Sequence, residues 1–203
     1  VLEKQAAKLG WIYVFPHFRG PNQTPAACGS ELAQQDILDA VVWAKQNYRV
    51  DHSRVYLTGA SGGGHMTMLM VSRHPKIWTA ASAWVGISDL TQWYTVHEKS
   101  RYGDMMRKSC GGAPGDSAIV DAQYRQRSPL PFLKNSKQVP LDIAAGIHDG
   151  HTGSVPISHS LLAFNEIAKA AGDRLITANE MKQLSIPHGR LENPLPLDSS
   201  SAE

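Results

Sequence analysis

The sequence predicts an α/β protein in which helices cover a mostly parallel sheet in three layers, and three observations support this prediction. Short, continuously apolar runs alternate along the chain with longer segments whose apolar residues repeat at helical spacing. The short runs do not alternate apolar with polar residues, which is typical of strands buried on both faces. Glycine or proline ends several of these segments. Strands that alternate with helices in this way indicate a parallel sheet.

In the first third of the chain, residues with clear conformational preferences delimit each element. A helix is expected to end at Gly10, because glycine favours the left-handed position that follows a helix. Pro16 stops the next apolar run, and Ser30 carries the hydroxyl group that suits a helix N-cap. The expected elements are, in order, a helix over Leu2–Leu9, a strand over Trp11–Phe15, a helix after Ser30, a strand over Val55–Thr58 and a helix after Ser61.

Further along the chain, the same rhythm adds two buried strands, Ala80–Val85 and Leu141–Gly146. A helix over about Pro156–Ala171 follows the second of these strands, and Gly172 is expected to end it.

Two stretches break the rhythm. Residues Trp93–Leu133 are polar, irregular and rich in Gly, Pro and Arg, so we expect an insertion over the edge of the sheet. Residues 173–203 are expected to form a short helix near Thr177–Leu184 and then loop, since the prolines of this tail argue against a strand.

The composition excludes several classes of protein. The chain has 203 residues, of which 42% are hydrophobic and 19% charged, and no apolar run is long enough to cross a membrane. A formal net charge of +2 gives no argument for a nucleic acid or a membrane surface as a partner. Cys28 and Cys110 leave open whether they pair, and no ligand set for a metal or cofactor is visible.

One short motif indicates chemistry. Residues 59–63, Gly-Ala-Ser-Gly-Gly, fit the pattern G-x-S-x-G between an expected strand and an expected helix. In that context the pattern predicts a nucleophilic serine, Ser61, on a sharp turn that requires flanking residues without side chains. The backbone N–H of Gly62 would then be one oxyanion donor, at the positive end of the helix dipole. A plain tight turn or a phosphate-binding nest is the alternative, although His65 follows where a phosphate loop has lysine.

A serine nucleophile needs a base and an acid that orients the base. Asp149 is the carboxylate in the loop after the last expected strand, which makes it the candidate acid, and a turn residue before Gly150 is the alternative. His188 follows Asp149 in the required order and is the candidate base, although no expected strand delivers it. His148 and His151 flank the acid and are candidates to line the site.

The remaining histidines are not expected to take part in catalysis. His65 lies one turn into the helix behind Ser61, where packing is the expected role. The others lack the spacing of metal ligands, so surface or loop positions are expected for them; they are His17, His52, His74, His97 and His159.

Several stretches between Ala7 and Ala171 resemble one enzyme family. The most specific is Asp51–Gly63, the run into the nucleophile, and the others are Pro16–Gly20, Asp36–Val41, Arg127–Leu130 and Val155–Pro156 with Ser158. Together they resemble the catalytic α/β-hydrolase domain of the prolyl oligopeptidase family of serine peptidases, whose relatives include esterases. The resemblance implies a catalytic core over residues 1–172, with the insertion at about 93–133, followed by the tail 173–203.

The same resemblance implies roles for individual residues. Ser61 is the nucleophile, Asp149 the acid of the triad and the Gly62 N–H an oxyanion donor. Trp93 and Tyr94 resemble the aromatic residues that wall the substrate pocket, and packing of the insertion onto the sheet is the alternative role for them. Family members also carry earlier strands, a further oxyanion loop and a last strand with the base. We therefore expect a catalytic domain that is incomplete at both ends.

Three functional hypotheses follow. The first is a serine peptidase that cleaves short peptides through an acyl-enzyme on Ser61, and the second is a carboxylesterase that acts on small acyl esters. Both take a small peptide or ester as partner. The third is a non-catalytic α/β module that keeps the fold and binds a ligand or a protein.

Overall fold

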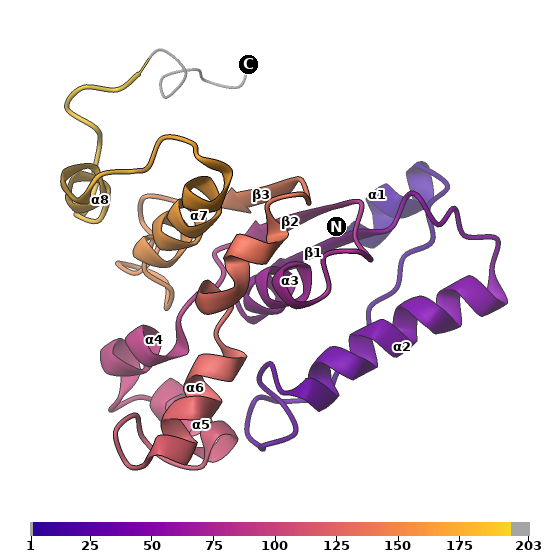
Figure 1. The fold of residues 1–203 in the computed structure, drawn as a ribbon, viewed down its shortest axis with the longest axis horizontal. Coiled ribbons are helices and arrows are strands. Elements are labelled where there is room, and N and C mark those ends of the chain that lie inside the picture. Colours follow the sequence, from indigo (N-terminus) through magenta and orange to yellow (C-terminus); the bar gives the residue numbers. More distant parts are fainter. Residues whose placement is uncertain (1, 196–203) are drawn as a thin grey trace.

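A parallel sheet lies at the centre of the molecule (Figure 1). The computed structural model describes residues 2–195, and within them the sheet has three strands in the order β1-β2-β3. These are β1 (Tyr56–Ala60), β2 (Ala80–Trp84) and β3 (Leu141–Ala144). Both pairings are parallel, and their register aligns the carboxyl ends of the strands at one edge. The expected fold class, α/β with a mostly parallel sheet, is confirmed.

The apolar core lies between one face of the sheet and three helices. Helix α3 (Gly62–Arg73), the 3₁₀ helix η1 (Leu130–Ser136) and helix α7 (Ser158–Ala171) pack on this face. Helix α2 (Glu31–Asn47), whose N-cap is Ser30 as expected, packs against the far side of α3. Helix α3 is consequently buried along most of its length, and its residues 68–71 have no measurable exposure. The G-x-S-x-G motif is therefore followed directly by a helix that is buried along most of its length.

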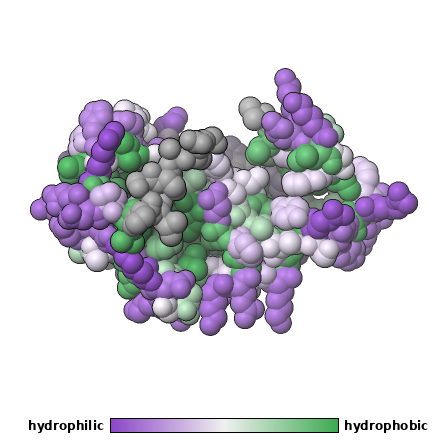
Figure 2. Space-filling view, turned by 90° about the horizontal axis from the view of Figure 1, so that it is seen from above, coloured by the Kyte–Doolittle hydropathy of each residue, from purple (hydrophilic) through white to green (hydrophobic). Residues whose placement is uncertain are grey.

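The opposite face of the sheet carries polar and aromatic side chains. Tyr56 and Trp84 are about half exposed, and the Trp84 indole donates a hydrogen bond to Ser82, whose hydroxyl donates to Asp142. Trp11 stacks on Tyr56 with ring centroids 5.3 Å apart. Viewed from above Figure 1, the molecule exposes hydrophobic residues between groups of hydrophilic ones (Figure 2).

The expected strand over Trp11–Phe15 is wrong. Helix α1 (Leu2–Lys8) forms close to its expected range, but residues 11–15 have no strand structure and their side chains are 38–80% exposed. An apolar run becomes a strand only when a neighbouring strand accepts and donates its backbone hydrogen bonds. In residues 2–195, β1 pairs with β2 alone, and no ladder reaches this segment.

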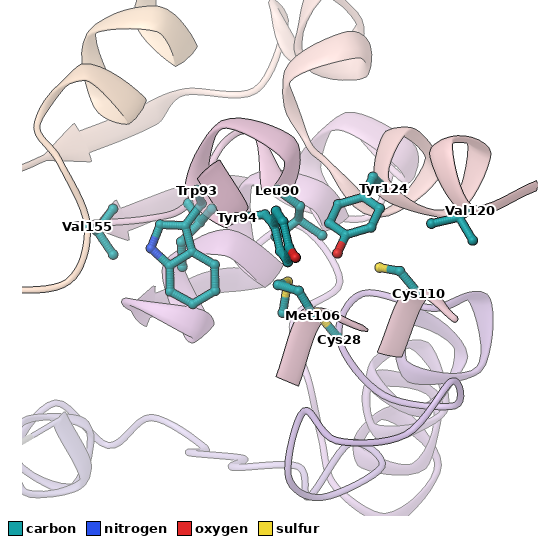
Figure 3. Packing of buried hydrophobic residues seen from close by; sticks show 10 residues of the cluster. Cys28, Leu90, Trp93, Tyr94, Met106, Cys110, Val120, Tyr124 and Val155 are labelled. Carbon is teal, nitrogen blue, oxygen red and sulfur yellow. The ribbon is translucent and has the colours of Figure 1, made fainter. Parts of the chain in front are cut away.

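Residues 93–133 are largely helical despite their irregular sequence pattern, and their role as an insertion over the edge of the sheet stays a prediction. The stretch contains the end of α4 (Leu90–His97), all of α5 (Arg101–Cys110) and all of α6 (Ala118–Arg127), followed by η1. Asp89, Ser100 and Ser117 each cap a helix by accepting a hydrogen bond from a backbone N–H. These helices bury a second apolar cluster (Figure 3); its members include Leu90, Trp93, Tyr94, Met106, Val120 and Tyr124.

The last described elements agree with the expectations. Helix α7 ends at Gly172, which has the left-handed backbone conformation, and α8 (Ala178–Leu184) begins with a reciprocal cap between Thr177 and Glu180. Residues 196–203 of the expected C-terminal loop lie outside the described residues. No helix within residues 2–195 is long and apolar enough to cross a membrane.

Cys28 and Cys110 both lie in the second cluster as free, buried thiols. Burial raises the pKa of Cys28 to about 11 and that of Cys110 to about 12, so both are thiols at neutral pH.

Candidate active site

Ser61 occupies the turn between β1 and α3 with a backbone conformation that few non-glycine residues adopt. Its φ is 55° and its ψ is −116°, and its backbone N–H donates to the Trp84 carbonyl oxygen at 2.8 Å. Such a conformation costs of the order of 1–3 kcal/mol and persists only where the surrounding structure imposes it. The residue is exposed, so the turn presents the hydroxyl group to solvent.

Two close backbone contacts impose this turn. A Cβ atom on Gly59 would lie 2.5 Å from the backbone of Gly63, and one on Gly64 would lie 2.5 Å from the Trp84 carbonyl oxygen. Helix α3 therefore starts in van der Waals contact with β1 and β2. A Cβ atom on Gly63 itself would meet nothing within 4 Å. The expectation that both flanking glycines of the motif must lack side chains thus holds for Gly59 and not for Gly63, and Gly64 supplies the second steric requirement.

Gly62 is the first residue of α3, directly after Ser61. The first N–H groups of a helix have no partner within the helix, and the helix dipole adds partial positive charge at this end. An N–H group in this position suits an oxyanion donor, and that role of Gly62 stays a prediction.

A loop that the sequence did not single out lies against this end of α3. The guanidinium group of Arg127, which is 5% exposed, donates to the carbonyl oxygens of Pro25 at 2.8 Å and of Ala27 at 2.7 Å. A Cβ atom on Gly29 would lie 2.9 Å from the ring of His65 on α3. The loop is thus fixed between α6 and α3. Its contacts join residues about 100 positions apart, which explains why no local pattern revealed it.

Asp149 lies in the loop after β3, at the same edge of the sheet as Ser61. One carboxylate oxygen accepts the backbone N–H of Gly146 at 2.6 Å, and the residue is half-buried. Gly150 has a φ of +87°, and a Cβ atom there would lie 2.5 Å from Pro156. The loop therefore turns back on itself, and it places the Asp149 carboxylate by local contacts.

The structure brings His188 to this loop. The rings of His188 and His148 lie edge to face with centroids 4.9 Å apart, and both residues are exposed. Within residues 2–195, no hydrogen bond or ion pair joins a histidine ring to the side chain of Asp149 or of Ser61. The structure therefore places His188 beside His148, the neighbour of Asp149, without assembling a triad, and His151 is also exposed.

Two histidines are buried and neutral. The Nε2 atom of His65 lies 2.8 Å from the Arg127 carbonyl oxygen, and burial lowers its pKa to about 4, so the predicted packing role is confirmed. His159 was expected on the surface or in a loop, and this is wrong. It is 2% exposed in α7, its Nδ1 atom faces Ser88, and burial lowers its pKa to about 4.

Trp93 and Tyr94 are buried in α4, at 5% and 6% exposure. The Trp93 indole donates to the Ser154 carbonyl oxygen at 2.8 Å, which joins α4 to the loop that follows Asp149. The Tyr94 ring packs edge to face on Tyr124 (Figure 3). Both residues thus stabilise the second cluster, and their role as pocket walls stays a prediction.

A comparison with models of protein families shows to which family the chain belongs. The family model described as "Prolyl oligopeptidase family" matches residues 3–183. The chain belongs to the prolyl oligopeptidase family. This membership makes it a relative of serine hydrolases, in agreement with the strand–turn–helix geometry at Ser61.

The individual proteins that are similar to this chain include peptidases and esterases. An uncharacterized peptidase, YtmA, of Bacillus subtilis is 29% identical over 161 residues, which cover 78% of this chain and 58% of the relative. Acetylxylan esterase A of Emericella nidulans is 39% identical over 120 residues, which cover 59% of this chain and 32% of the esterase.

Among solved structures, an acylaminoacyl peptidase of Pyrococcus horikoshii superposes with a TM-score of 0.58 at 26% identity, over 75% of this chain and 23% of that one. A puromycin-hydrolyzing peptidase of Mycobacterium tuberculosis gives a TM-score of 0.60 at 22% identity, over 73% and 20%. The chain thus spans less than two thirds of the length of each of these relatives.

Proposed function

We propose that the protein is a serine hydrolase that cleaves the peptide bonds of short peptides through an acyl-enzyme on Ser61. The observation that carries this proposal is the turn at Ser61, where an exposed hydroxyl stands on a strained backbone that Gly59 and Gly64 impose. Backbone strain of this kind is found often at functional positions. At Ser61 the strained backbone coincides with the G-x-S-x-G motif and with the start of a helix, and this combination supports a nucleophile.

The proposed reaction follows from the roles of the residues at the edge of the sheet. A histidine takes the proton of the Ser61 hydroxyl while the Ser61 oxygen attacks the carbonyl carbon of the substrate. The electron pair of the carbonyl double bond moves onto the carbonyl oxygen. The Gly62 N–H donates a hydrogen bond to that oxyanion. The carbonyl bond re-forms, the scissile bond breaks, and the histidine returns its proton to the leaving amine. Water then releases the acyl group in the same way.

Asp149 is the acid that orients the histidine in this proposal, and His188 is the candidate base because it lies against His148 in the same loop region. Trp93 and Tyr94 are proposed to wall the pocket for a small apolar side chain. The hydrogen bond of Trp93 to Ser154 supports a place for α4 beside the acid's loop.

Hydrolysis of small acyl esters is the second candidate. The relationship to acetylxylan esterases supports it, because the shared stretch extends over 59% of this chain in the Emericella nidulans enzyme. A serine triad acts on esters and on amides by the same steps, so the choice depends on the leaving group that the pocket accepts.

The test compares hydrolysis of peptide anilides with hydrolysis of short p-nitrophenyl esters by the purified protein. The proposal predicts turnover of anilides, its loss in Ser61→Ala and in Asp149→Asn, and normal activity in Ser53→Ala, a matched change in the turn that precedes β1. Turnover of esters alone would favour the esterase. Equal activity of Ser61→Ala and wild type would contradict both, and absence of activity would favour a binding module.

A further inference from the structure

We propose that Asn22 supplies a second hydrogen-bond donor to the oxyanion that forms at Ser61, beside the Gly62 N–H. This assignment rests on the proposed acyl transfer. A Cβ atom on Gly62 would have one neighbour within 4 Å, the Nδ2 atom of Asn22 at 3.8 Å. Because the N and Cβ atoms of a residue lie about 2.5 Å apart, Nδ2 is within about 6 Å of the Gly62 nitrogen. One oxygen that accepts hydrogen bonds of ordinary length from both groups can bridge that distance.

The hydrogen bonds of the Asn22 amide fix which of its atoms faces Gly62. Its Oδ1 atom accepts the Cys28 backbone N–H at 3.0 Å, which only the oxygen of the amide can do. The NH₂ group is therefore the end that approaches Gly62. It has no acceptor within the part of the chain that the structure describes, and the residue is half-buried. Asn22 thus presents donors, and no acceptor, toward Gly62 at the start of α3.

The backbone at Asn22 is fixed from two sides, which preorganises these donors. The Ser109 hydroxyl on α5 donates to the Asn22 carbonyl oxygen at 3.2 Å. Further along the same loop, Arg127 holds the carbonyl oxygens of Pro25 and Ala27. A donor that is held in place before the reaction stabilises developing charge without reorganisation at the moment of reaction. Asn22 keeps both of its protons throughout and forms no covalent bond.

A purely structural role for Asn22 makes a different prediction. If the residue only holds the loop, then its oxygen matters, because that atom accepts from Cys28. If it stabilises the oxyanion, then its NH₂ group matters. Asn22→Asp separates the two roles, because it keeps an acceptor of the same shape and replaces the donors with a negative charge. Asn22→Ala removes both.

The experiment measures the rate of Ser61 phosphonylation by a fluorophosphonate, and kcat and KM for a p-nitrophenyl ester, in four proteins. These are wild type, Asn22→Asp, Asn22→Ala and Gln23→Glu, which places the same charge on the neighbouring exposed residue. We expect kcat and the phosphonylation rate to fall roughly 100-fold or more in both Asn22 variants, and furthest in Asn22→Asp. KM should change by less than about threefold, and Gln23→Glu should resemble wild type.

Each other outcome overturns the assignment in a recognisable way. Normal rates in Asn22→Asp with slow rates in Asn22→Ala would show that the residue only holds the loop. Normal rates in both variants, or an equal loss in Gln23→Glu, would show that its amide has no specific role. Wild-type protein that neither reacts with the fluorophosphonate nor hydrolyses the ester would contradict the proposed function itself, and the Asn22 assignment with it.

Discussion

The turn at Ser61 and the loop at Asp149 lie at the same edge of the sheet, but they are held in different ways. The Ser61 turn is fixed by backbone packing, since Gly59 contacts Gly63 and Gly64 contacts the Trp84 carbonyl. The Asp149 loop is held by the hydrogen bond of Asp149 to Gly146 and, further along, by the bond of Trp93 to Ser154, and the candidate base His188 is exposed. Close backbone contacts therefore fix the nucleophile turn, whereas on the acid side the candidate base His188 is exposed and its ring has no hydrogen bond to Asp149 within residues 2–195.

This difference teaches which part of a catalytic site a short sequence motif can encode. A steric requirement between residues a few positions apart can be predicted from the residue types alone, as at Gly59. The meeting of an acid with a base joins distant segments, and it depends on how those segments fold. Four predictions test or sharpen this contrast, from the largest expected effect to the smallest.

Gly59→Ala should destabilise the protein by about 3 kcal/mol, because its Cβ atom would lie 2.5 Å from the Gly63 backbone and neither element can retreat cheaply. Gly63→Ala is the matched control. It places a Cβ atom in open space inside a helix, and it should stabilise the protein by up to about 1 kcal/mol. Urea denaturation of both variants measures the two values. Equal destabilisation would show that helix propensity and not close packing governs this turn.

The free energy of unfolding should fall as the pH is lowered from about 6.5 to about 4. His65 is buried and neutral when folded, with a pKa of about 4, whereas in the unfolded chain its pKa is near 6.5. The unfolded state therefore binds more protons in this range, and stability is lost as the pH falls, by up to about 3 kcal/mol for this residue. Above pH 6.5 the contribution should be constant.

The variant His65→Gln checks the assignment. It retains an N–H donor for the Arg127 carbonyl oxygen but does not titrate, so its stability should depend less on pH in this range. Urea midpoints at pH 7 and pH 5 provide the comparison. The same pH dependence in variant and wild type would assign the effect elsewhere, with His159 as the next candidate.

On the acid side, Gly150→Ala should cost about 2 kcal/mol, because its φ of +87° and the 2.5 Å approach to Pro156 both oppose a side chain. Gly153→Ala, whose Cβ atom would make only an ordinary contact 3.7 Å from Asp149, should be close to neutral. Thermal unfolding and ester hydrolysis report the two effects. Because the loop is a surface element, the relative loss of ester hydrolysis should be larger than the relative loss of stability. A loss of stability as large as that of Gly59→Ala would contradict the proposed difference between the two sides.

Trp93→Phe should have the smallest effect, about 1 kcal/mol. It keeps most of the buried ring but removes the hydrogen bond to the Ser154 carbonyl oxygen. Hydrogen exchange of the backbone amides in residues 150–156 should become faster while that of α3 is unchanged. Faster exchange in α3 as well would mean that the two sides of the site are coupled through the second cluster.

The sequence predicted the elements that build the nucleophile side. Ser30 caps α2, the strand–serine–helix order at Ser61 is present, and Gly172 ends α7 as expected, because each depends on neighbouring residues. Trp11–Phe15 was mispredicted because strand formation requires a hydrogen-bonded partner that no local pattern specifies. Asn22 was missed for a related reason, since only tertiary packing places its amide against Gly62.

The central claim is that the turn at Ser61 presents an activated nucleophile, and the site of fluorophosphonate modification tests it most directly. The purified protein is treated with the reagent, digested, and mapped by tandem mass spectrometry. The account predicts one adduct, on the peptide that contains Ser61, and its loss in Ser61→Ala. An adduct on another serine, or labelling that persists in Ser61→Ala, would contradict it.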